Sequence, residues 1–156
     1  MFVFTPKAYL KEDLGYINCT PHEITIQSRE WGKDATILEP SGIVVRVEQK
    51  FTPIEHGLCH AEFGKVINLP SPEEGVGYVV SGMVLSAVEA ENRNIYWHLT
   101  EHGEDEDTHP DEIRLDVFAP ATGHPHTERN DKGHIVSVPC LIAPTLEGER
   151  WYWTMP

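Results

Sequence analysis

The chain has 156 residues, 40% of them hydrophobic and 24% charged, which is the composition of a globular protein with one domain. Its net charge is −13, from 12 basic and 25 acidic residues, so nucleic-acid backbones and anionic membranes are unfavourable partners. We find no run that approaches the ~20 apolar residues of a membrane span, and no signal-peptide pattern in the stretch MFVFTPKAYLKED.

The three cysteines are isolated from one another. Cys19, Cys59 and Cys140 form no CxxC pair, and an odd number without a pairing pattern is typical of reduced thiols. The sequence therefore predicts a cytoplasmic protein.

Short apolar runs between turn residues predict strands in the first half of the chain. Ile24 and Ile26 alternate with polar neighbours, which is the period of a half-buried strand. The segment DATIL (34–38) is expected to pair with GIVVRVEQ (42–49) through the intervening Pro-Ser-Gly turn. A further strand, EFGKVINLP, is expected to end at Pro70.

In the second half, a buried strand at 78–80 leads into apolar residues at helical spacing, so a short helix is predicted to begin near Ser81. Strands are expected at 94–101 and 113–120, a hairpin at 126–138 that turns at Gly133 in a left-handed conformation, and a last strand at RWYWTMP. The fold class predicted is a β-rich α+β domain over residues 1–156, with a mostly antiparallel sheet and one or two short helices.

Several segments together resemble one family. INCTPHEI, EPSGIVVRV, EFGKVINLPSPEEGVGYVVSGMV and LDVFAPATG followed by RNDKGHIVSV occur in the order found in a family of short, largely uncharacterised proteins from phages, prophages and bacteria. The resemblance implies a phage origin, and it implies that residues at about 91–113 are an insertion. That segment contains EHGEDEDTHPDE (101–112), with seven acidic and no basic side chains, which predicts a solvated surface insertion. Polar positions that match the family are Asn18, Thr20, His22, Ser81, Asp116, Thr122 and Arg129.

Six of these positions form the predicted ligand-binding set: Thr20, His22, Ser81, Asp116, Thr122 and Arg129. Ser81 would cap a helix whose free N–H groups can face an anion. Arg129 would either pair with Asp116, which is the favoured interpretation, or hold an anionic ligand with its guanidinium group.

Two histidine-containing stretches are candidate metal sites, but each also has a simpler structural interpretation. His124 and His126 are separated by Pro125, which favours an irregular loop, and His56, Cys59 and His60 lack a second ligand pair. The sequence contains no P-loop, GxGxxG or HExxH motif. We therefore predict neither a metal nor a cofactor.

Two functions remain open from the sequence. The first is a non-enzymatic, phage-encoded binding protein that occupies a host protein or a small polar or anionic ligand, with neither nucleic acid nor membrane as partner. The alternative is a small hydrolase or lyase that uses Thr20, His22, Asp116 and Arg129, with or without a divalent metal.

Overall fold

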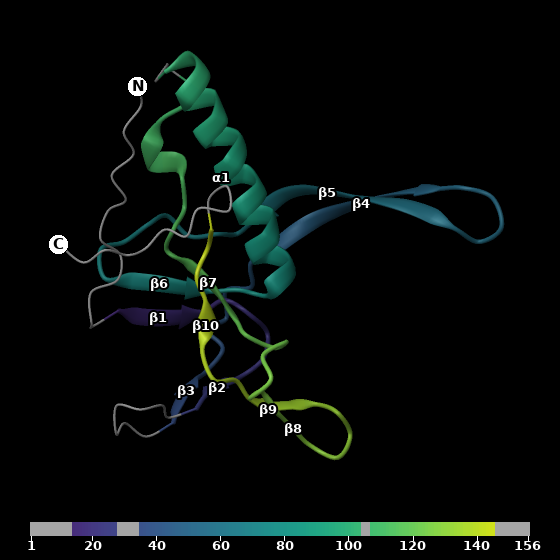
Figure 1. Ribbon diagram of the computed structural model, residues 1–156, viewed down its shortest axis with the longest axis vertical. Helices are drawn as coiled ribbons and strands as arrows, with labels where there is room; N and C mark the ends of the chain where they lie inside the picture. The colour runs from purple at the N-terminus through teal and green to yellow at the C-terminus, as the bar shows by residue number, and fades with distance from the viewer. Residues whose placement is uncertain (1–13, 28–34, 104–106, 146–156) are drawn as a thin grey trace.

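A four-stranded sheet forms the centre of the molecule, as seen in a computed structural model that describes residues 14–27, 35–103 and 107–145. The sheet order is β1 (Gly15–Asn18), β6 (Val76–Val79), β7 (Val117–Pro120) and β10 (Leu141–Ile142). The first three strands are parallel to one another, and β10 is antiparallel to β7 (Figure 1). The predicted strand at RWYWTMP lies outside the described residues.

The helix α1 (Gly82–His102) connects β6 to β7 and makes the crossover that two parallel strands require. Ser81 is its N-cap, which confirms the predicted start. The helix is 21 residues long, longer than predicted, and it includes residues 94–101, for which a strand was wrongly predicted. The physical reason is that residues 83–102 contain neither Gly nor Pro, so nothing ends the helix before Gly103.

Three two-stranded antiparallel units surround the central sheet. They are β2 (Ile24–Ile26) with β3 (Thr36–Leu38), β4 (Arg46–Pro53) with β5 (Cys59–Ile67), and β8 (Glu128–Arg129) with β9 (Ile135–Ser137). A short 3-10 helix, η1 (Pro110–Glu112), precedes β7. The predicted β-rich α+β class with mostly antiparallel strand pairs is therefore confirmed.

The predicted pairing of DATIL with GIVVRVEQ is wrong, because β3 pairs with β2 instead. After Leu38 the chain does not turn back on itself. The Ser41 N–H donates to the Asn18 carbonyl at 3.0 Å, and the Val45 N–H donates to the Cys19 carbonyl at 3.0 Å. These bonds lead the chain along the end of β1 before β4 begins.

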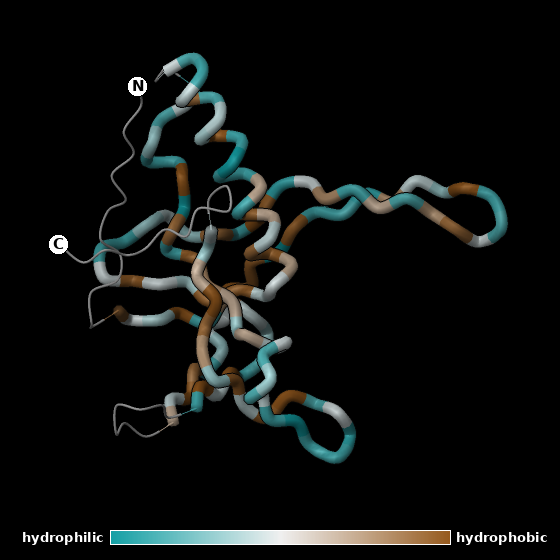
Figure 2. The backbone as a smooth tube through the Cα atoms, viewed as in Figure 1, coloured by the Kyte–Doolittle hydropathy of each residue, from teal (hydrophilic) through white to brown (hydrophobic). Residues whose placement is uncertain are grey.

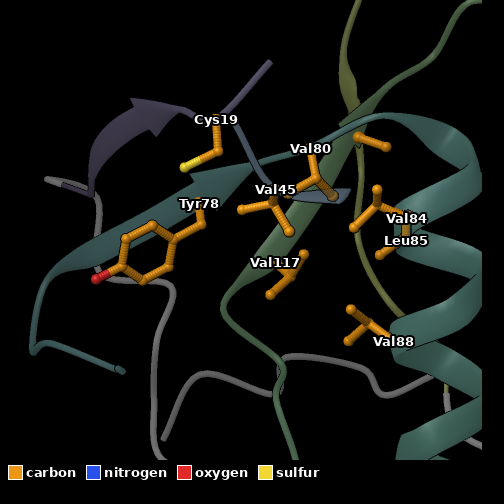
Figure 3. Packing of buried hydrophobic residues seen from close by; sticks show 9 residues of the cluster. Cys19, Val45, Tyr78, Val80, Val84, Leu85, Val88 and Val117 are labelled. Atoms are coloured by element: carbon orange, nitrogen blue, oxygen red, sulfur yellow. The ribbon is translucent and has the colours of Figure 1, made fainter. Parts of the chain in front are cut away.

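The main core lies between α1 and the central sheet, where valines predominate (Figure 3). A second cluster, formed by Leu99, Ile113 and Leu115, fixes the far end of α1. Leu99 and Ile113 lie within residues 91–113, where a surface insertion was predicted. Because both side chains are packed in this cluster, that segment is not a surface insertion over its whole length. Among the described residues, no helix combines the length and apolar character that crossing a membrane requires.

Candidate functional site

A cavity lies where the parallel strands end. Because β1, β6 and β7 run in the same direction, their carboxyl ends meet at one edge of the sheet, which is where open sheets with parallel strands bind ligands. Thr20, Ser81 and Thr122 each follow one of these ends by two residues. All three line a cavity of about 800 Å³, together with residues of the β2 strand and the β8–β9 hairpin. Both hairpins, β2–β3 and β8–β9, lie on one side of the central sheet (Figure 1).

The sequence-predicted ligand set is divided by the structure. Five of the six residues line the cavity, and they are Thr20, His22, Ser81, Thr122 and Arg129. Asp116 does not. It precedes β7 while Thr122 follows it, and six residues of extended chain span roughly 20 Å.

Asn18 builds the turn that carries Thr20 and His22 to the cavity. Its buried side-chain amide donates to the carbonyls of His22 at 2.7 Å and Leu38 at 2.9 Å. Its side-chain oxygen accepts from the N–H of Thr20 at 3.0 Å and from the Thr20 hydroxyl at 2.7 Å. The Thr20 hydroxyl is therefore used to hold the turn.

Ser81 and Gly82 place the first turn of α1 at the cavity wall. The Ser81 Oγ accepts from the N–H of Val84 at 3.3 Å, as expected of an N-cap. A side-chain carbon added at Gly82 would meet no atom within 4 Å, so this part of the wall is open.

Arg129 is held at the cavity by two main-chain carbonyls. Its guanidinium donates to the carbonyl of Gly133 at 2.9 Å and to that of Thr122 at 3.2 Å. These bonds use two of its five N–H donors and leave its charge unneutralised by either carbonyl. The β8–β9 hairpin thus presents a positioned cation to the cavity.

The predicted pairing of Arg129 with Asp116 is wrong. Asp116 is buried and binds Arg114 through both oxygens, at 2.9 Å to Nε and 3.0 Å to Nη2. Arg114 also donates to the Pro70 carbonyl at 2.7 Å. Residues two apart in an extended chain share a face, so Arg114 is the nearer cation.

The cavity also contains polar residues that the sequence did not single out. His134 and Ser137 line it from β9 and the turn before it. The Ser137 hydroxyl accepts from the side-chain amide of Gln27 at 3.0 Å and donates to Glu128 at 3.1 Å, so it ties β9 to β2 and β8. The alternation of HIVSV, which directs every second side chain to the same face, could have indicated Ser137.

Carboxylates mark one part of the rim. A hydrogen bond with Glu23, and then the repulsion from its charge, raise the pKa of the exposed Glu39 carboxyl. Glu23 lines the cavity, so the rim is acidic near β2 and basic at Arg129 on the opposite hairpin.

The histidine-containing stretches do not assemble a metal site. The main-chain N–H of His126 donates to Nδ1 of His124 at 3.0 Å, which occupies one ligating nitrogen. His56 has a positive φ of 65° in the turn between β4 and β5, while Cys59 and His60 begin β5. Within residues 14–27, 35–103 and 107–145, no group of three or more His, Cys, Asp or Glu side chains is arranged to hold a metal ion.

Comparison with known proteins returned no matching protein-family model, no matching curated protein and no matching solved structure.

Proposed function

We propose that this protein binds a small polar molecule with an anionic group in the cavity at the carboxyl edge of the sheet, without catalysing a reaction. The observation that carries the proposal is the convergence of Thr20, His22, Ser81, Thr122 and Arg129 on one cavity of about 800 Å³. This volume lies within the ~300–1,000 Å³ of small-molecule sites.

Three features support an anionic group in the ligand. Arg129 presents a fixed guanidinium, which suits the planar recognition of a carboxylate or phosphate. Gly82, at the first turn of α1, lines the same cavity, and a helix N-terminus favours an anion. Thr122 and His22 add further hydrogen-bonding groups to the lining of the cavity.

Binding is favoured over hydrolysis or elimination because the residues needed for catalysis are separated or already in use. The Thr20 hydroxyl is bonded to Asn18, and Asp116 is bonded to Arg114 at the other end of β7. We expect Asp116→Asn to lower the thermal stability while leaving ligand affinity within about twofold, since it acts on the Arg114 pair alone. Loss of affinity in a folded Asp116→Asn protein would favour the enzyme alternative.

The proposal is tested with matched pairs of compounds that differ in one phosphate: AMP with adenosine, and ribose 5-phosphate with ribose. Thermal unfolding is followed at 10 mM compound. For a Kd near ~0.1 mM, mass action adds about 2.7 kcal/mol, which raises Tm by roughly 5–10 °C at this chain length. We expect at least one phosphorylated member to stabilise the protein and its neutral partner to have no effect.

Three arginine variants test the role of the Arg129 charge. Arg129→Ala should abolish the shift, while Arg93→Ala, which removes the same charge from the exposed part of α1, should preserve it. Arg129→Lys should retain part of the shift because the charge remains. Equal stabilisation by both members of a pair, or no stabilisation by either phosphorylated compound, would overturn the proposal of an anionic ligand.

The biological setting follows from the resemblance and from the cysteines. We propose that a phage encodes the protein and that it acts in the cytoplasm of the host cell, where binding would withdraw a small molecule from host use. All three cysteines are free thiols, as this compartment favours.

A further inference from the structure

The β4–β5 ribbon is a two-stranded arm that projects from the rest of the molecule (Figure 1). Its residues are exposed along almost all of its length, from Glu48 to Gly64. Isolated two-stranded ribbons are marginally stable in water and generally need a further packed layer. A β-bulge between Val47 and Gln49 marks the position where the arm leaves the body, since Val47 and its partner Val66 are still partly buried.

Along the paired strands the two faces of the arm differ in polarity, and the exposed Ile54 and Leu58 lie beyond these strands at the tip. Register pairs Gln49 with Phe63, Phe51 with Ala61 and Pro53 with Cys59, so these six side chains share one face, here called the apolar face. The alternate pairs, Lys50 with Glu62 and Thr52 with His60, place polar groups on the other face. Figure 2 shows this mixture of apolar and polar residues along the arm.

The apolar face is open to solvent. Phe51 is 58% exposed and Phe63 is 59% exposed, so covering each would bury somewhat more than half of the ~150–250 Å² that an aromatic side chain can bury. At the base of the arm, Met83 of α1 is 51% exposed and accepts a hydrogen bond from the Gln49 amide at 3.5 Å. The apolar face therefore continues onto the first turn of the helix.

We infer that the apolar face binds the same face of a second copy of this chain. On this face each phenylalanine lies opposite a smaller residue, Phe51 opposite Ala61 and Phe63 opposite Gln49, in a diagonal arrangement. Large side chains of one copy can fit over small ones of the other when two such faces stack about a twofold axis. The face is complementary to itself.

The charge of the arm does not oppose contact with a second copy and gives a basic partner no reason to prefer the arm. Residues 46–67 contain three basic side chains (Arg46, Lys50, Lys65) and three acidic ones (Glu48, Glu55, Glu62), so the arm is neutral in a chain of net charge −13. A basic protein would be attracted to the acidic body. Two neutral arms can meet while they hold the acidic bodies apart, which reduces their mutual repulsion.

The area of the contact sets its strength. The exposed parts of the two phenylalanines, Met83 and the small residues amount to ~400 Å² per copy, so two copies bury ~800 Å², below the ~1,200 Å² of standard interfaces. The dimer is therefore weak and reversible, with a dissociation constant on the order of 1–100 µM.

The test is sedimentation velocity on the full chain between about 2 and 200 µM, with two variants that place the same charge on opposite faces. The wild-type chain and Thr52→Glu should dimerise alike, and Phe51→Glu should weaken dimerisation at least ~10-fold, as expected for a central aromatic residue. Circular dichroism verifies that each variant is folded, and Phe63→Ser replaces Phe51→Glu if that variant is not. Raising NaCl from 50 to 500 mM should strengthen the dimer by screening the acidic bodies.

Cysteine labelling provides a second readout within the same chain. Cys59 lies on the apolar face, whereas Cys140 is exposed elsewhere, so alkylation of Cys59 alone should slow as protein concentration rises. A wild-type chain that stays monomeric at 200 µM would overturn the inference. The apolar face would then be covered by another segment of the chain or by another protein. Equal weakening by Phe51→Glu and Thr52→Glu would also overturn the inference.

Discussion

Asn18 is the residue on which the cavity wall at Thr20 and His22 depends. Its buried amide satisfies two carbonyls and accepts two hydrogen bonds, and it joins the end of β1 to Leu38 at the end of β3. A buried polar group left without its partner costs ~1–3 kcal/mol. The turn is therefore fixed before any ligand enters.

We expect Asn18→Ala to lower the free energy of unfolding by ~2–4 kcal/mol, because two carbonyls lose their donor and a cavity is created. Urea denaturation measures the loss. Asn94→Ala is the matched control: Asn94 is exposed on α1, and alanine is the better helix former, so stability should be unchanged or slightly raised. A neutral Asn18→Ala would contradict the structural role assigned to the side chain.

Two buried groups make stability depend on pH in the alkaline range. Burial raises the pKa of Tyr78 above 10.0, with additional effects from Glu73 and Asp116, and burial raises the pKa of Cys19 above 9.0, partly offset by a hydrogen bond with Ser41. The unfolded chain loses these protons at lower pH than the folded chain. The stabilisation is therefore fully present below pH 9 and is lost as pH rises through the folded-state values.

Urea denaturation between pH 8 and pH 10.5 should accordingly show a decreasing free energy of unfolding. Tyr78→Phe should flatten the part of the decrease above pH 10, although it also removes the hydrogen bond from the Tyr78 hydroxyl to the Ser71 carbonyl at 2.9 Å. An unchanged slope in Tyr78→Phe would show that other groups cause the decrease.

At the scale of single residues, the sequence indicated which polar residues matter but not which residues they bond to. Five of six selected residues line one cavity, since Thr20, Ser81 and Thr122 each follow the end of a parallel strand. Arg129 does not pair with Asp116 because Arg114, two residues before Asp116, binds that carboxylate. The spacing of two in IRLDVF contains that information, because alternate residues of an extended segment share a face.

Among the elements, the β8–β9 hairpin determines the position of Arg129. The turn is closed by the Gly133 N–H, which donates to the Asn130 carbonyl at 2.9 Å, and Gly133 has a φ of 79°, which confirms the predicted left-handed glycine. Its carbonyl in turn accepts from Arg129. One glycine thus links the turn to the proposed ligand site.

We expect Gly133→Val to destabilise the protein by ~1–2 kcal/mol, because a β-branched residue is strained at positive φ. Gly123→Val is the control. Gly123 has no positive φ, and an added side-chain carbon there would also meet no atom within 4 Å. Thermal unfolding compares the two, and equal losses would mean that backbone strain at Gly133 is not the cause.

The helix and the hairpins illustrate which elements local patterns can predict. The N-cap at Ser81 and the turn at Gly133 depend on residues within a few positions of each other, and both were predicted. In contrast, β3 pairs with β2, and the chain after β3 is bonded to the end of β1 through Ser41 to Asn18 and Val45 to Cys19, roughly 25 residues earlier. No residue pattern within residues 34–49 predicts those contacts.

At the scale of the whole molecule, the order of strands in the central sheet is the feature that local sequence patterns predict least. Gly15 pairs with Val76, and Tyr78 pairs with Val117, across long intervening segments. The cavity lies where these distant parallel strands end, so the sequence could not predict its location. Most of the residues selected from the sequence as ligand-binding nevertheless line it. Composition and charge, in contrast, do describe the molecule as a whole.

The net charge of −13 limits the size of the proposed anionic ligand. A small phosphate compound inside the cavity interacts chiefly with Arg129 and the groups beside it, whereas a nucleic acid must also lie along the acidic surface. We therefore expect a 20-base-pair DNA duplex to show no change in fluorescence anisotropy up to about 50 µM protein in 50 mM NaCl, the low-salt condition that most favours phosphate contacts. The same protein sample should be stabilised by AMP or by ribose 5-phosphate. DNA binding that weakens steeply with added salt would show that a basic surface dominates the acidic field, and the ligand would then have to be sought among polyanions.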